Sequence, residues 1–309
     1  MASGRRYGDR LGKVSNMDRL RVTGYHRRLP HLVADEKEFF AAEGLEVDYH
    51  ITTFAPDHNE GMAEGRWDFT LSSADTMIAR TTTDGTDYML FMQAEEGLNA
   101  TLIGRPEITA ISDLSGTVLA GDPGDSNLDL IRRKIMRVGG IGEDAYEVDI
   151  IGTSPKRLEA LLEGKVSAAM LAPPSSQKAL DAGCVALAEA DDYVPGWPRT
   201  CGWGLRGWVE GHRELVVRFI RAWEAASDWT LGPANREAAL ELLMATEGLN
   251  RDRAELAYRQ LVPKAKINRA AMQTVIDLRI ELGVYAPPHS PPERFYDTSY
   301  WCEATGLPA

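Results

Sequence analysis

The chain has 309 residues, 44% of them hydrophobic and 26% charged, which suits a globular protein with a large buried core. A formal charge of −12 at pH 7 argues against nucleic acid as a partner, and no apolar run is long enough to cross a membrane. Three scattered cysteines, Cys184, Cys201 and Cys302, predict neither a disulfide framework nor a zinc site.

Residues 1–17 form a polar, basic extension with no apolar stretch before Leu20, so they do not have the pattern of a secretory signal peptide. We therefore expect a cytoplasmic protein. A periplasmic or cell-surface location would follow only if a signal peptide had been removed and replaced, and Met17 hints at an alternative start.

Strands and helices alternate through most of the sequence. Expected strands cover residues 20–24, 45–51, 67–71, 88–93, 148–151, 166–171, 185–187 and 203–209, and residues 111–120 are expected to form a turn followed by a strand. Expected helices cover residues 31–43, a segment around Met62, 75–81, 128–138, a segment from Pro155, 213–231, 235–246, 251–261 and 268–282. The proline-rich tail, with residues 295–301, is expected to wrap around the protein in an extended form.

Two stretches look like copies of each other. Residues 61–75 and 160–174 each end a helix on Glu-Gly, add a cation, pass through a short apolar strand and stop in small residues. Gly65 and Gly164 suit the left-handed position after a helix. The offset of 99 residues between Glu64 and Glu163 suggests two α/β lobes of one design, although helix–glycine–strand units are common and coincidence is the alternative.

The order of elements resembles the type II periplasmic solute-binding proteins of the nitrate, sulfonate and thiamine-precursor (NMT1/THI5-like) group. The residues that carry the resemblance are 29–47, 64–69, 111–116, 162–168 and 216–222. It implies a two-lobed α/β Venus-flytrap fold with two hinge crossings, near residues 97–104 and 199–206. The first lobe would combine residues 18–98 with 205–309, and the second would hold 99–204.

The first strand-end loop is the main candidate for contact with an anion. In this family the loop faces the cleft, and here it holds Tyr25, His26, Arg27 and Arg28. A guanidinium can grip a carboxylate with two hydrogen bonds, and a histidine can move a proton near neutral pH. The alternative is a solvated loop whose cations point outward.

A second candidate is the helix start after Gly121, where Asp122, Gly124, Ser126 and Asn127 could present free backbone N–H groups to an anion. Ser126 or Asn127 could equally be an ordinary helix cap.

Further candidates lie at other strand ends. Ligand contact is considered for Ser72, Ser73, Gln93, Glu95, Pro173 and Trp203, and proton transfer for His26, His58 and Asp75. Helix capping by Ser73 and Asp75, a solvated His58 and a core Trp203 are the simpler alternatives. Cys201 has no histidine near it in sequence, which favours a buried, inert thiol. Sulfinate-cleaving relatives carry a nucleophilic cysteine in the first loop, and this loop has none.

We expect a small anionic ligand, an aromatic or heterocyclic carboxylate, in the cleft between the lobes, with no metal and no cofactor. The main hypothesis is a cytoplasmic decarboxylase-like lyase that uses acid–base chemistry. The alternative is the substrate-binding receptor of an ABC importer, which would meet a permease only if the protein is exported.

Overall fold

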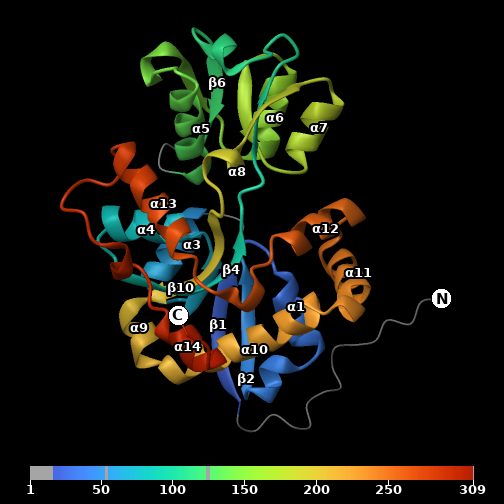
Figure 1. The fold of residues 1–309 in the computed structure, drawn as a ribbon, viewed down its shortest axis with the longest axis vertical. Helices are drawn as coiled ribbons and strands as arrows, with labels where there is room; N and C mark the ends of the chain where they lie inside the picture. Colours follow the sequence, from blue (N-terminus) through green and yellow to red (C-terminus); the bar gives the residue numbers. More distant parts are fainter. Residues whose placement is uncertain (1–16, 53–54, 123–125, 309) are drawn as a thin grey trace.

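The structure is a computed structural model that describes residues 17–52, 55–122 and 126–308. Two five-stranded sheets form the cores of two lobes, which lie one above the other in Figure 1. The first sheet contains β1 (Asp18–Gly24), β2 (Leu45–Ile51), β3 (Phe69–Ser72), β4 (Tyr88–Glu96) and β10 (Pro198–Leu205). The second contains β5 (Thr101–Gly104), β6 (Val118–Gly121), β7 (Glu147–Ile150), β8 (Ala168–Leu171) and β9 (Val185–Glu189). The predicted two-lobed α/β architecture is confirmed.

Both sheets have the same design. Their strand orders are β2-β1-β3-β10-β4 and β7-β6-β8-β5-β9, so three parallel strands are followed in each by one antiparallel strand. The two similar stretches of sequence supply β3 and β8, which occupy the same middle position in their sheets. Gly65 and Gly164 precede these strands with φ of +70° and +74°, as the pattern predicts.

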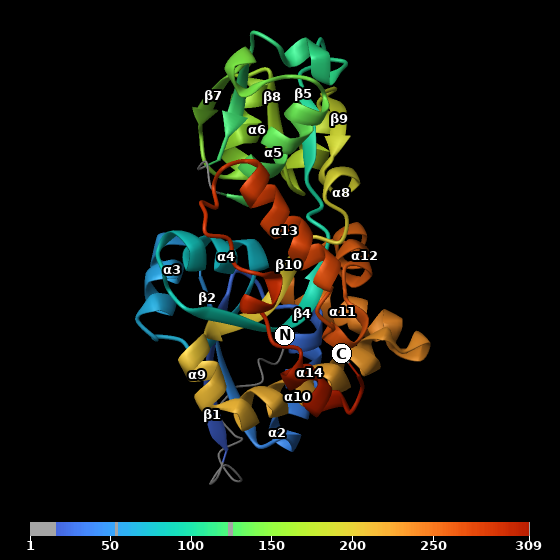
Figure 2. The same cartoon turned by 60° about the vertical axis from the view of Figure 1, so that its left-hand side comes forward.

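Helices cover the faces of both sheets. Those before the first crossing are α1 (Leu29–Glu36), α2 (Phe39–Ala42), α3 (Ala55–Ala63) and α4 (Ala74–Thr83). The second lobe has α5 (Asn127–Val138), α6 (Ser154–Leu162), α7 (Ser175–Asp181) and α8 (Ala190–Tyr193). The last part of the chain forms α9 (Arg206–Gly211), α10 (Arg213–Leu231), α11 (Arg236–Glu247), α12 (Arg251–Arg259), α13 (Arg269–Glu281) and α14 (Ser299–Thr305). The long α10 buries its apolar face against α1, α2 and α14, low in Figure 2.

Three local predictions differ from the structure. The single helix expected over residues 31–43 is two helices, because Glu38 adopts a left-handed conformation with φ of 60°. The strand expected over residues 203–209 begins earlier, and residues 206–211 form α9. The tail is not wholly extended, because residues 299–305 form α14.

The chain crosses between the lobes twice. It leaves β4 for β5 through residues 97–100 and returns from α8 to β10 through residues 194–197. β10 pairs with β3 and β4, so it lies in the first lobe, whereas the sequence places residues up to 204 in the second. Gly202 and Gly204 interrupt the apolar pattern of this strand and hide its start. Each is packed closely: a Cβ on Gly202 would lie 2.6 Å from the Phe91 ring.

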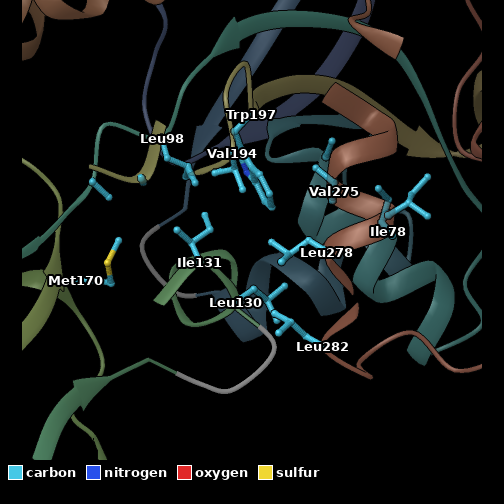
Figure 3. Close-up of a cluster of buried hydrophobic side chains, with 14 of the residues drawn as sticks. Ile78, Leu98, Leu130, Ile131, Met170, Val194, Trp197, Val275, Leu278 and Leu282 are labelled. Carbon is cyan, nitrogen blue, oxygen red and sulfur yellow. The ribbon is translucent and has the colours of Figure 1, made fainter. Parts of the chain in front are cut away.

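An apolar cluster joins the lobes on one side of the crossings (Figure 3). Leu130 and Ile131 of α5 belong to it, together with Leu278 of α13 and Leu282 just after that helix. An ion pair between α5 and α13 extends the contact, with Lys134 Nζ 2.7 Å from Glu281 Oε2. α13 thus ties the first lobe to the second.

Candidate functional site

A cavity of about 350 Å³ is lined by residues of both lobes. The loop after β1 contributes His26, Arg27 and Arg28 to its wall, and α1 contributes its first residue, Leu29. Ala172, Pro173 and Pro174, which follow β8, face it from the second lobe. The first crossing adds Asn99, the end of β4 adds Glu95 and the start of β10 adds Arg199. The carboxyl ends of β1 and β8 therefore meet at this cavity, as expected for ligand sites in open α/β sheets.

The remaining wall comes from α11 and α12, on the right in Figure 1. Its apolar members include Leu243, Leu249 and Leu256, and its charged members are Glu247 and Arg253. These helices cover the side of the cleft away from α13, so the cavity and the apolar cluster lie on different sides of the crossings.

Cations outnumber anions in the lining. The lining has four guanidinium groups, those of Arg27, Arg28, Arg199 and Arg253, and two carboxylates, those of Glu95 and Glu247. An acidic protein therefore carries a locally positive cavity, which attracts anions.

Glu95 organises one end of this charged lining. Its buried carboxylate lies 3.1 Å from Arg28 Nη1 and accepts a 2.8 Å hydrogen bond from the Thr200 hydroxyl. Arg199, next to that threonine, donates a 2.5 Å hydrogen bond to Gln260 Oε1. Burial lowers the pKa of the Arg199 guanidinium, and the nearby Glu95 opposes that shift. Glu95 thus joins the first loop to both crossing strands.

His26 stands at the solvent-facing edge of the cavity. Partial desolvation lowers the pKa of its imidazole, and the charges of Arg28 and Arg199 lower it further. The backbone is held by Tyr49, whose hydroxyl donates a 2.8 Å hydrogen bond to the His26 carbonyl. A neutral imidazole at neutral pH can accept a proton or a hydrogen bond from a ligand.

The other two residues considered for proton transfer lie outside the cavity lining. His58 is fully buried, with Nε2 2.9 Å from Thr70 Oγ1 and its ring 5.3 Å from that of Tyr25. Asp75 is buried against α13, where its Oδ1 lies 3.5 Å from Arg279 Nη1. Both have structural partners within the first lobe.

Several predicted ligand contacts also lie outside the lining. Ser73 caps α4 by accepting a hydrogen bond from the Asp75 amide, and the buried Ser72 hydroxyl lies 3.3 Å from Thr70 Oγ1. Gln93 accepts a 3.0 Å hydrogen bond from the Asn268 amide. Trp203 is fully buried in the apolar cluster.

The predicted helix-start site does not join the cavity through any described residue. Ser126 caps α5 by accepting from the Asp129 amide at 3.2 Å, and Asn127 is the first residue of the helix. The Asp122 carboxylate lies 3.6 Å from Arg157, and the space beside them does not admit a water molecule. Gly124 lies outside the described residues.

Sequence reasoning missed Arg199, Glu247, Arg253 and Gln260. Arg199 is the second residue of β10, whose start the sequence predicts too late. The other three lie in or directly after segments predicted only as helices. No local signal marked Arg253, because α12 carries arginines at positions 251, 253 and 259 and only Arg253 lines the cavity.

Other chemistries find little support in the part of the chain that is described. No group of three histidine, cysteine, aspartate or glutamate side chains there could hold a metal ion. The Cys201 thiol is completely buried, and burial raises its pKa, which disfavours a thiolate nucleophile. Within the same residues, no helix has the length and apolar character needed to span a bilayer.

The comparison with protein families gives one match. The family model described as "NMT1/THI5 like" matches residues 26–236, more than half of the sequence. The chain belongs to this family. The matched range begins in the first cavity loop and extends through both sheets. No curated protein sequence matches this NMT1/THI5-like chain.

Solved structures confirm the periplasmic-binding-protein fold. The aliphatic sulphonate binding protein SsuA of Escherichia coli is 17% identical, with a TM-score of 0.72, and the match covers 92% of this chain and 99% of that one. The alkanesulfonate-binding SsuA of Xanthomonas axonopodis pv. citri, bound to MOPS, is 14% identical with a TM-score of 0.70 over 88% and 96%. The desulfurization enzyme DSZB also shares the fold, at 14% identity and a TM-score of 0.68 over 94% and 99%. The fold therefore occurs in receptors and in an enzyme.

Proposed function

We propose that this protein is a solute-binding receptor whose two lobes close on a small organic anion. The observation that carries the proposal is the interlobe cavity, in which four arginines face two glutamates. Family membership and the sulfonate-binding proteins of the same fold support it. A sulfonate or carboxylate head group would pair with guanidinium groups, since such charge-assisted hydrogen bonds are strong when desolvated.

The apolar part of the lining suits the rest of such a ligand. Leu29 and Pro173 face the cavity from opposite lobes, and the leucines of α11 and α12 add to the same wall. A mostly apolar pocket with a few placed polar groups is the usual form of a small-molecule site. Closure of the lobes would bury the ligand between these walls.

The comparisons favour this receptor over the lyase that the sequence suggested as the main hypothesis. An acid–base enzyme would have to draw its proton carrier from His26, Glu95 and Glu247, because His58 and Asp75 do not line the cavity. DSZB keeps an enzymatic alternative in view, since it is a desulfurization enzyme with this fold. The two functions differ in whether the ligand is consumed.

A thermal-shift screen of sulfonates and carboxylates, followed by calorimetry, tests binding. Arg27→Gln should weaken a bound anion about 10- to 100-fold, because it removes a charged hydrogen-bond donor. Arg259→Gln is the matched control, since Arg259 is an exposed cation of α12 that does not line the cavity. Equal affinities in the two variants would place the anion elsewhere.

Mass spectrometry of the ligand after incubation separates receptor from enzyme. A receptor returns the anion unchanged. If product appears, His26→Asn should abolish it while retaining much of the affinity, because asparagine forms hydrogen bonds but cannot carry a proton at neutral pH. Product formation by the wild-type protein would refute the receptor proposal.

The two functions also imply different locations. A receptor that serves an ABC importer meets its solute outside the cytoplasm, so periplasmic or cell-surface exposure goes with the proposal, whereas a cytoplasmic location goes with the enzyme. Fractionation of the native cells with an antibody against the protein distinguishes them. Detection only in the cytoplasmic fraction would contradict a role in import.

A further inference from the structure

We infer that the cavity selects an organic dianion whose two anionic groups are separated by an apolar body. This inference rests on the proposed function and deepens it, since it names the class of solute. A dicarboxylate or a sulfocarboxylate has the required chemistry. The inference comes from how the charges of the lining are paired and from which elements carry them.

One pair of charges in the lining is already satisfied. Arg28 and Glu95 lie 3.1 Å apart, and the threonine hydroxyl at position 200 completes the coordination of the carboxylate. This pair offers a ligand little net charge, because each partner neutralises the other. It fixes the loop after β1 against the crossings.

Three guanidinium groups are not matched in this way. Within the described residues, Arg27, Arg199 and Arg253 have no carboxylate oxygen within 4 Å. The Nε of Arg27 is buried without a hydrogen-bond partner, and Arg199 donates only to the neutral Gln260. All three side chains are partly buried, and a partly desolvated cation without a carboxylate at ion-pair distance gains from an anionic ligand.

One carboxylate offsets them. Glu247 lines the cavity and takes part in none of the ion pairs found among the described residues. Three unmatched cations against one unmatched anion leave a surplus of two positive charges. A monoanion would neutralise half of that surplus, and a dianion would neutralise it all.

The unmatched arginines come from three different elements. Arg27 lies in the loop after β1, Arg199 in β10 and Arg253 in α12. Leu29, Leu249 and Leu256 belong to the same lining. Because three different elements carry these charges and the same lining has apolar members, we expect two separate anionic groups to suit it better than one compact dianion such as a phosphate. The carboxylate of Glu247 would repel an anionic group of the ligand that lay beside it.

The test is calorimetry with paired acids on the full chain. Each dicarboxylate, from succinate to suberate with isophthalate and terephthalate, is compared with the monocarboxylate of the same carbon skeleton. Phenyl phosphate serves as the compact dianion. We expect at least one dicarboxylate to bind about tenfold or more tightly than both its monocarboxylate partner and phenyl phosphate.

Arg253→Gln should remove most of that preference. It should weaken the best dicarboxylate about 10- to 100-fold and its monocarboxylate partner by less than threefold. Arg259→Gln, on the same helix but outside the lining, should leave the preference unchanged. Circular dichroism and the unfolding temperature of each variant establish that both remain folded.

The outcomes separate the two levels of the proposal. If monocarboxylates bind as tightly as their dicarboxylate partners, the dianion inference is wrong and the anion receptor stands. Tightest binding of phenyl phosphate overturns the separation of the two groups. If no acid in the series binds, the dianion inference fails, and the proposed function fails with it only if the sulfonates of the thermal-shift screen do not bind either.

Discussion

A buried glutamate outside the cavity lining should make the free energy of unfolding fall as pH rises, whereas most carboxylates in folded proteins make it rise. Glu224 lies in α10, with 7% of its surface exposed. Its Oε1 accepts a 3.2 Å hydrogen bond from Trp301 Nε1 of α14, and Oε2 is buried with no partner. Burial raises the pKa of this carboxyl from 4.5 to about 7, although Trp301 and the charge of Lys264 oppose the shift.

The sign and size follow from this shift. Between pH 4.5 and 7 the folded protein holds a proton that the unfolded chain has lost, so stability falls as pH rises through this window. Above pH 7 the ionised carboxylate is present in both states, and its burial costs about 3 kcal/mol, from a shift of about 2.5 units at 1.36 kcal/mol each. Glu224→Gln keeps the acceptor for Trp301 and removes the ionisation.

Urea unfolding at pH 4.5, 6, 7 and 8.5 measures the effect. Glu224→Gln should gain stability over the wild type as pH rises, by about 3 kcal/mol at pH 8.5, and should gain almost nothing at pH 4.5. Glu214→Gln, an exposed position on the same helix, is the control and should show no such trend. A difference between Glu224→Gln and wild type that does not change with pH would refute the reasoning.

Three further predictions concern groups outside the cavity. Arg279→Met should destabilise the fold by about 3–5 kcal/mol in urea unfolding, because it leaves Asp75 buried without its cation; a loss below 1 kcal/mol would contradict this. Thr70→Val should cost about 1–3 kcal/mol, since it removes the hydroxyl that pairs with a buried histidine, and anion affinity should not change. In thiol labelling of the native protein, the partly exposed Cys302 should react while Cys201 reacts only on unfolding, and early labelling of Cys201 would disprove its burial.

The fold was predictable because its signals are local. The apolar strands at β3 and β8, each preceded by a glycine after a helix, are visible in short windows of sequence, and their similarity indicates two lobes of one design. The limits of β10 were less predictable. Its glycines at positions 202 and 204 serve close packing against neighbouring strands and break the apolar pattern.

The site was predictable only in part, because its walls come from distant parts of the chain. The loop that holds Arg27 follows the first strand directly, so strand-end reasoning finds it. Arg253 reaches the same cavity from a helix more than 200 positions later, and no local pattern links the two. Asp75 shows the converse: its chemistry suggests a role in proton transfer, but its partner is Arg279 of α13.

The position of β10 has a consequence for how the protein is synthesised. All five strands of the second sheet lie between residues 101 and 189, so every strand of that sheet is synthesised before β10. The first sheet lacks its fourth strand until then, which leaves the edges of β3 and β4 unpaired in the nascent chain. Unpaired edges readily pair with other chains, so a translation product that stops shortly before Pro198 should aggregate through the first lobe, not the second.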